Sequence, residues 1–368
     1  MKMNKQKIDV GAFIWPSYTG HEPRTTMFWT EGHGEWETVR DAKPKFPGHM
    51  WPRKPLLGYK DEAEPETMEE QIDLALSHGV NVFIYDWYWF DDRPFLEQCL
   101  DEGFLGARNN GKMKFYLMWA NHNANNLWDR RISDLPENII WQGKVFPESF
   151  RRIADRWFTK YFFLDNYYRI DGKPVVAIYD LQNFIDGFGS VPAAREAMEW
   201  LNDEAVRRGL PGVHIQLIHQ KGTEKNLTGI DTGRGDDKYL GKFPFSSMTH
   251  YQFVHFTDVG RDYLTVRDDV LGEWARLTAL TDTPYYPHVS IGWDNNPRFK
   301  KLRPDILTDN TPENFKILLR DAKKYAEEHN SPIVTVNSWN EWTEGSYLLP
   351  DDLNGYGYLD AVKEVFSD

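Results

Sequence analysis

Apolar runs of strand length alternate along the chain with segments in which apolar residues recur every three or four positions. The runs are rich in β-branched and aromatic residues and cover 10–15, 80–85, 114–119, 174–179, 213–218, 248–253, 285–291 and 333–339. The segments with helical spacing cover 65–78, 94–102, 147–158, 192–208, 263–280, 311–329 and 359–366. Eight strands that alternate with helices predict an α/β fold with a parallel sheet, namely a single (β/α)8 TIM barrel domain over residues 1–368.

Two regions depart from this regular alternation. The run 248–253 is the weakest strand, because it follows an irregular glycine-rich region around Gly233. The loop 19–64 after the first strand is far longer than a plain connection from strand to helix, and loops of that length are usually functional. It carries several tryptophans and acids, so two roles are considered: a lid that supplies stacking for a sugar, or a structural plug folded on its own aromatic side chains.

The last strand leads into a pair of acids in an aromatic setting. Residues 333–347 read IVTVNSWNEWTEGSY, with Glu341 and Glu344 three positions apart. A helical turn stopped at Gly345 would bring Glu344 back over Glu341. Two carboxyls about 5 Å apart in an aromatic pocket suit acid-assisted cleavage of a glycosidic bond. An acidic pair on a solvated helix face is the alternative, but interleaved aromatics such as Trp342 disfavour it, so both glutamates are catalytic candidates.

Polar and aromatic residues gather at or just past the carboxyl ends of the predicted strands. Barrel active sites lie at that rim, so residues distant in sequence can converge there. The candidate substrate-binding residues are Trp15, Tyr18, Trp36, Asp86, Trp87, Trp119, Asn121, His122, Asp180, His219, Tyr251, Trp293, Asp294, Asn340 and Trp342. For the three aspartates in this set, ligand contact and a structural role in the loops are weighed equally.

The composition of the chain limits the classes of molecule that the protein is expected to bind. A formal net charge of -13 argues against nucleic acid or an anionic membrane, because both reward basic patches. The single Cys99 excludes an internal disulfide. His250 and His255 have no third ligand at a recognisable metal spacing, so neither a metal nor a cofactor is expected. Aromatic residues make up 15% of the chain, more than a core demands, and those beside polar residues suit sugar stacking.

The sequence shows no apolar run long enough to span a membrane. The N-terminus does not read as a signal peptide, because Asp9 and Pro16 interrupt its first apolar run. A soluble protein is therefore expected, cytoplasmic by default, or periplasmic or secreted if a signal has been removed. The oligomeric state is left open.

Five segments carry a resemblance to a known family. They read FPGHMWPRKPLLGYKD (46–61), FIYDWYWF (83–90), MWANHNANNLWD (118–129), GWDNNPR (292–298) and SWNEWTEGSYLLPD (338–351). In content and order they resemble the WbsX family, whose members are similar to glycoside hydrolase family 99. The resemblance implies a (β/α)8 barrel that acts on carbohydrate, with a Glu-x-x-Glu pair that carries the chemistry.

The same resemblance implies distinct roles for the two acids. Glu341 matches a base that deprotonates the sugar's own 2-hydroxyl, which then forms a 1,2-anhydro intermediate. Glu344 matches the acid that protonates the leaving oxygen and afterwards activates water. The chain departs from its relatives at His122, where they usually have Glu, and at Leu349, where an acid is common, so the subsite near the third strand is expected to differ.

These features favour a retaining glycoside hydrolase that acts on α-mannoside-like or α-rhamnoside-like linkages of a carbohydrate substrate. The alternatives are a glycosyltransferase of polysaccharide biosynthesis and a non-catalytic glycan-binding barrel. The lack of an Asp-x-Asp motif after any predicted strand disfavours the transferase. In the glycan-binding alternative, the same aromatics would hold sugar and the acids would only accept hydrogen bonds.

Overall fold

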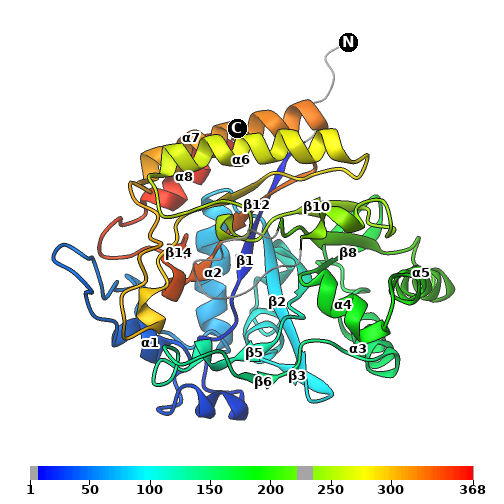
Figure 1. Ribbon diagram of the computed structural model, residues 1–368, viewed down its shortest axis with the longest axis horizontal. Helices are drawn as coiled ribbons and strands as arrows, with labels where there is room; N and C mark the ends of the chain where they lie inside the picture. Colours follow the sequence, from blue (N-terminus) through cyan, green and yellow to red (C-terminus); the bar gives the residue numbers. More distant parts are fainter. Residues whose placement is uncertain (1–6, 222–234, 368) are drawn as a thin grey trace.

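The computed structural model describes residues 7–221 and 235–367 and contains a central parallel sheet (Figure 1). Its principal strands are β1 (Asp9–Ile14), β2 (Val82–Phe90), β4 (Lys114–Trp119), β8 (Lys173–Ile178), β9 (His214–Ile218), β10 (Ser247–Thr249), β11 (His288–Ser290) and β12 (Ile333–Asn337). They neighbour one another in chain order, and β1 pairs with both β2 and β12. A parallel bridge between Met248 and Tyr285 joins β10 to the segment before β11 and closes the ring.

Helices surround this ring of strands and connect most of them. They are α1 (Trp36–Arg40), α2 (Pro65–Ser77), α3 (Pro147–Lys160), α4 (Leu181–Phe188), α5 (Val191–Arg207), α6 (Tyr263–Leu280), α7 (Pro312–His329) and α8 (Gly357–Phe366). In Figure 1, α6, α7 and α8 lie together on one side, while α3, α4 and α5 lie on another. This arrangement confirms the predicted (β/α)8 barrel.

Short elements decorate the ends of the barrel. The short strands are β3 (Arg93–Phe95), β5 (Ala124–Asn125), β6 (Ile139–Trp141), β7 (Arg169–Ile170), β13 (Asn340–Glu341) and β14 (Ser346–Tyr347). The short helices are η1 (Pro23–Met27), η2 (Cys99–Phe104), η3 (Asn110–Lys112), η4 (Asn126–Trp128), η5 (Asp236–Tyr239), η6 (Phe253–His255), η7 (Asn296–Arg298) and η8 (Trp342–Glu344). Among the described residues, none of the helices combines the length and apolar character needed to cross a bilayer.

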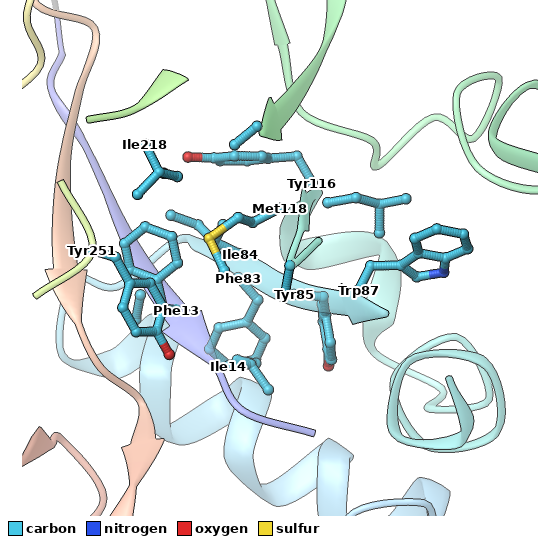
Figure 2. Packing of buried hydrophobic residues seen from close by; sticks show 14 of the residues in the cluster. Phe13, Ile14, Phe83, Ile84, Tyr85, Trp87, Tyr116, Met118, Ile218 and Tyr251 are labelled. Atoms are coloured by element: carbon cyan, nitrogen blue, oxygen red, sulfur yellow. The ribbon is translucent and has the colours of Figure 1, made fainter. Parts of the chain in front are cut away.

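The principal strands are buried on both faces, because one face lines the barrel interior and the other packs on helices. Phe13 and Tyr251 lie against each other inside the barrel, with ring centroids 4.8 Å apart (Figure 2). Trp87 lies on the far side of β2 from this pair. Its register partner on β4, Trp119, shares that outer face, and both rings contact Trp157 of α3 at centroid distances of 5.6 and 5.8 Å.

The structure corrects several predicted boundaries. The segment 94–102 is not one helix: β2 runs on to Phe90 and pairs with antiparallel β3, and a π-helix follows at η2. The run of β-formers in FIYDWYWF extends the strand, and Pro94 is tolerated because β3 is an edge strand. Strands six and seven are shorter than the predicted 248–253 and 285–291, and β12 ends two residues before the predicted 339.

Helix α4 is an element that hydrophobic spacing did not predict. Asp180 caps it by accepting a hydrogen bond on Oδ1 from the Asn183 amide at 2.7 Å, and Gly189 ends it at φ 79°. An Asp cap followed by a glycine stop is a local signal for a short helix.

Candidate active site

A cavity of about 410 Å³ lies at the carboxyl ends of the barrel strands. Of the sequence-predicted site residues, eight line it: Trp15, Asp86, His122, Asp180, Tyr251, Trp293, Glu341 and Glu344. Asp86 lies within β2, and the others lie at or just past the ends of six other strands, so the barrel brings together side chains that are far apart in the sequence.

The local fold places both glutamates of the pair at this cavity. After β12, strands β13 and β14 form a small antiparallel hairpin, and the 3-10 turn η8 lies between them. Residues three apart eclipse each other in a 3-10 turn, so Glu344 falls on the side of Glu341. Gly345 ends the turn at φ 63°, a conformation that glycine adopts without strain. Both side chains are largely buried, at 5% exposed for Glu341 and 12% for Glu344.

One guanidinium links the two acids. Arg298 of η7 donates from Nη1 to Glu344 Oε1 at 2.7 Å and from Nη2 to Glu341 Oε2 at 3.4 Å. Its Nε donates to Glu35 Oε1 at 2.9 Å. Burial alone would lower the pKa of Arg298, but these three carboxylates together raise it. Arg298 therefore stays charged and partly balances the acids.

The electrostatics of the pair favour at least one bound proton. Burial raises the pKa of Glu341 well above its ordinary value, and the charge of Glu344 adds to this effect. Burial also raises the pKa of Glu344, although Arg298 opposes the rise. The shorter bond from Arg298 favours Glu344 as the ionised member in the free site. Two buried carboxylates that share one cation are costly to ionise together, so the pair is expected to titrate as a unit.

Tyr251 couples the protonation state of Glu341 to that of Asp86. Its hydroxyl lies 2.8 Å from Glu341 Oε1 and 2.9 Å from Asp86 Oδ2. A hydroxyl has one proton, so it donates to only one of these carboxyls, and the other must supply a proton of its own to complete both bonds. Burial raises the pKa of Asp86 well above its ordinary value. If Glu341 is to be ionised as a base, the protonated partner is Asp86.

We expect Asp86→Asn and Asp86→Leu to differ in activity. The asparagine can still donate to the Tyr251 oxygen, so its kcat/KM should stay close to wild type. The leucine leaves a buried hydroxyl with an unfilled bond, which should lower kcat/KM by about tenfold to a hundredfold. Steady-state kinetics at matched pH, with melting temperatures as a fold check, measure the difference. Equal losses in both variants would show that Asp86 works as an ionised carboxylate.

A second group of predicted residues lies directly behind the cavity wall. Asn340 accepts from the Trp15 amide at 2.8 Å and donates to the Trp15 carbonyl at 2.9 Å, so it joins the ends of β1 and β13. Tyr18 accepts from the Trp342 amide at 3.2 Å. Trp36 packs on Trp342 with ring centroids 5.6 Å apart. These four, Tyr18, Trp36, Asn340 and Trp342, do not line the cavity, and they hold the segment that carries the glutamates.

Asn121 has a similar structural role between β4 and β8. Its side-chain amide accepts from the Asp180 amide and donates to the Asp180 carbonyl, each at 2.8 Å. Asp180 therefore both caps α4 and faces the cavity. His122 lies at the cavity wall beside Tyr88, with Nε2 3.4 Å from the tyrosine hydroxyl.

Three predicted residues point away from the cavity. Trp87 and Trp119 pack between the sheet and α3, since each follows an inward-facing residue, Asp86 or Met118, in its strand. His219 lies on the α6 side of the barrel, where it approaches His250 and Glu273. None of these three residues is among those that line the cavity of the glutamate pair.

The long loop 19–64, which the structure describes in full, contributes no residue to the cavity lining. Its tryptophans are buried, as expected of the plug rather than of the lid. Glu35, fully buried, accepts bonds from Arg298, from Trp15 Nε1 and from Thr343 Oγ1. Glu35 of this loop thus supplies a negative charge that balances Arg298, the arginine that binds the glutamate pair.

The loop also clamps Asp294, which lies outside the cavity. His49 Nε2 and Trp51 Nε1 lie 2.7 and 2.6 Å from Asp294 Oδ2, and Asn296 donates to Oδ1 at 2.7 Å. Burial would raise the pKa of Asp294, but these bonds lower it overall. The structure thus gives Asp294 the loop role, one of the two alternatives weighed for it.

We expect Asp294→Asn to destabilise the fold by about 1–3 kcal/mol at neutral pH, the cost of a buried charged hydrogen-bonding partner. Because the folded-state pKa is depressed, this stabilisation is present above the unfolded pKa and is lost as pH falls through the folded one. Urea unfolding at several pH values tests this. A stability difference that grows as the pH falls would contradict the assigned ionised clamp.

Several cavity residues were not predicted. They include Tyr88, Trp128, Tyr179 and Arg298. Two features of the sequence could have identified Tyr88 and Arg298. Strand alternation places Tyr88 on the same face as Asp86, two positions earlier. Charge balance requires a cation near two buried acids, and Arg298 ends the GWDNNPR segment at the same rim.

Comparison with known proteins gives a match to one protein family. A family model described as glycosyltransferase WbsX matches residues 10–362. Two curated relatives, both called uncharacterized protein WxcX and both from Xanthomonas campestris pv. campestris, are 28% identical over 353 residues and 94% of this chain. The chain spans about half the length of these relatives, 48%.

Solved structures share the fold. A glycoside hydrolase-like protein superposes with a TM-score of 0.63 at 18% identity, over 100% of this chain and 96% of the other. The GH99 endo-alpha-mannosidase from Bacteroides thetaiotaomicron, in complex with BIS-TRIS-Propane, gives 0.58 at 15% identity over 98% and 97%. At these identities the likeness establishes the barrel fold.

Proposed function

Because the chain belongs to the WbsX family, and because its cavity presents Glu341 and Glu344 on one arginine, we propose that it is a retaining glycoside hydrolase. Its substrates are α-mannoside-like or α-rhamnoside-like linkages of an oligo- or polysaccharide. The observation that carries this proposal is the largely buried glutamate pair at the carboxyl end of the barrel. The GH99 endo-alpha-mannosidase of the same fold supports the manno configuration.

In the proposed reaction, ionised Glu341 takes the proton of the sugar's 2-hydroxyl, whose oxygen then attacks the anomeric carbon. Glu344 gives a proton to the leaving oxygen, and a 1,2-anhydro sugar forms. Glu344 next removes a proton from water, which opens the anhydro ring, and Glu341 returns its proton to O2. Two inversions leave the anomeric configuration unchanged. An axial 2-hydroxyl trans to the scissile bond, as in mannosides and rhamnosides, suits this route.

These roles require a particular position for one proton. In the free site Arg298 favours an ionised Glu344, whereas the acid role needs the proton there. The pair holds one proton in either case, so substrate binding has to move it from the Glu341 side to Glu344. The sugar hydroxyl can drive this shift, because it offers Glu341 a new hydrogen bond that favours the ionised carboxylate.

The surroundings of the pair fit a neutral sugar. Asp86, Asp180 and Glu137 also line the cavity, while Arg298 is already bound by three carboxylates. An anionic ligand would meet a surplus of acids there. Trp15, Trp128 and Tyr88 supply aromatic faces on which a sugar ring can stack.

A screen of defined oligosaccharides tests the proposal, with the product anomer followed by proton NMR at early times. Hydrolysis with retained configuration is expected. Inversion of configuration would reject the assigned roles, and sugar binding without turnover would favour the glycan-binding barrel.

The family description favours one second candidate, a glycosyltransferase. A donor sugar nucleotide carries a diphosphate, which the acidic cavity would repel unless another cation accompanied it. A rise in melting temperature with nucleotide sugars, and not with oligosaccharides, would favour the transferase over the hydrolase.

A further inference from the structure

A second cluster of chemically reactive side chains lies outside the cavity, between the barrel and α6. His219 follows β9, His250 follows β10, and Glu273 comes from α6. One potential ligand atom from each lies within 4.8 Å of the other two. All three are buried, with His219 and His250 fully inaccessible. None of the three lines the cavity of the glutamate pair.

The two imidazoles present free nitrogens in this cluster. His219 Nδ1 and His250 Nε2 are buried and have no hydrogen-bond partner among residues 7–221 and 235–367. A buried polar atom without a partner costs about 1–3 kcal/mol, and such an atom calls for an ion or a water that satisfies it. Each of the two nitrogens carries this cost, in a cluster that also contains the Glu273 carboxylate.

The remaining nitrogen of each ring is held by a neighbour. His219 Nε2 lies 2.9 Å from Asp237 Oδ1, and His250 Nδ1 lies 2.7 Å from the Tyr285 hydroxyl. A carboxylate only accepts, so Nε2 of His219 carries a proton, and Nδ1 is the nitrogen that can offer a lone pair to a metal ion. Histidine ligands of metals commonly donate their other N–H to a carboxylate in this way, which fixes the tautomer and the ring orientation.

From this geometry we infer that His219, His250 and Glu273 form a binding site for a divalent transition-metal ion of the Zn²⁺ type. Two imidazole nitrogens and a carboxylate oxygen make a three-ligand set that Zn²⁺ accepts, with a water in the fourth position. Hard cations such as Mg²⁺ and Ca²⁺ prefer oxygen ligands and fit the histidines poorly. In the sequence, His250 and His255 had no third ligand at a metal spacing, because the other two residues of this cluster come from the end of β9 and from α6.

The charges around the cluster set its affinity. Glu273 already accepts from Arg276 at 2.8 and 2.7 Å and from Lys221 at 3.1 Å, and Arg276 also binds Asp237. These two cations balance the two carboxylates, so the ion brings net positive charge. The metal is therefore expected to displace Lys221 from Glu273, since the lysine is partly exposed and can turn to solvent.

The position of the site suggests what the ion stabilises. The residues after the two histidines, Gln220 and Tyr251, line the cavity, and Tyr251 lies at hydrogen-bond distance from Glu341. Tyr285, which contacts His250, also forms the bridge that closes the barrel beside β10. A bound ion would hold these strand ends against α6, at the place where the sheet is joined by a single bridge.

The test uses the full chain, freed of metal with a chelator and then titrated with Zn²⁺ or Co²⁺. We expect one equivalent of Zn²⁺ by elemental analysis, a higher melting temperature with Zn²⁺ but not with Mg²⁺, and visible absorption from bound Co²⁺. Asp237→Asn changes a partly exposed side chain and should lower Zn²⁺ affinity about 10- to 100-fold. His219→Gln should abolish stoichiometric binding. His214→Gln, a buried histidine of β9 outside the cluster, is the matched control and should bind Zn²⁺ as wild type does.

Two results would overturn the inference. One is a wild-type protein that takes up no more Zn²⁺ than the His219→Gln variant. The other is an imidazole nitrogen NMR spectrum in which His250 Nε2–H donates directly to His219 Nδ1 and does not change when Zn²⁺ is added. Asp237→Asn keeps the outcome interpretable if His219→Gln fails to fold.

Discussion

Glu344→Gln is expected to lower kcat/KM for unactivated glycosidic linkages by about 10²–10⁴-fold, the usual contribution of a general acid. Glutamine cannot give a proton to the leaving oxygen, so the loss should depend on how much the leaving group needs one. Aryl glycosides whose phenols are strong acids leave without that proton. For them kcat/KM, which reports the steps up to the first irreversible one, should be close to wild type.

Glu341→Gln should behave differently and so provides the matched comparison. A base toward the 2-hydroxyl is needed whatever the leaving group, so kcat/KM should fall by about 10²–10⁴-fold for activated and unactivated substrates alike. Melting temperatures of both variants serve as the fold check. If Glu344→Gln lost equal activity on both substrate classes and Glu341→Gln recovered with activated ones, the two roles would have to be exchanged. Activity that survives both substitutions would remove the pair from the mechanism.

The sequence predicted the barrel because strand and helix periods are local properties. Predictions were less accurate where tertiary pairing decides the length of an element. FIYDWYWF continues as β2 because β3 pairs back on it, and β10 keeps only Ser247–Thr249 because its outer neighbour is a single bridge. Neither partner can be read from the segment itself.

The candidate site was predictable in part for a related reason. Asp86 and Trp87 are consecutive in a strand, so they point to opposite faces, and only Asp86 lines the cavity. Position at a strand end therefore identified the rim, while alternation was needed to select the side chains that face inward. Arg298 ends the short helix η7 and Glu35 directly precedes α1, and their contacts depend on how these two segments pack together, which no local pattern specifies.

Arg298 and Glu35 are expected to move the pH–rate profile in opposite directions. Arg298 lowers the pKa of both glutamates, so Arg298→Met should raise those pKa values and shift both limbs of kcat/KM to higher pH. It should also reduce the maximal rate by about 10²–10³-fold, comparable to the loss of one preorganised donor. The charge of Glu35 raises the pKa of both glutamates, so Glu35→Gln should shift both limbs to lower pH.

The opposite signs separate an electrostatic role from a structural one. A residue that only supports the loop would lower the rate or the melting temperature without moving the limbs of the profile. Two matched controls should leave the pH–rate profile unchanged. Arg303→Met is the control for Arg298, because it lies five residues later and outside the cavity lining. Glu37→Gln is the control for Glu35, because it lies two residues later in α1. Arg298→Lys keeps the charge and should leave the limbs near their wild-type positions. Shifts of the same sign in Arg298→Met and Glu35→Gln would contradict the assignment, because the pair would then be responding to a shared distortion rather than to the charge of each neighbour.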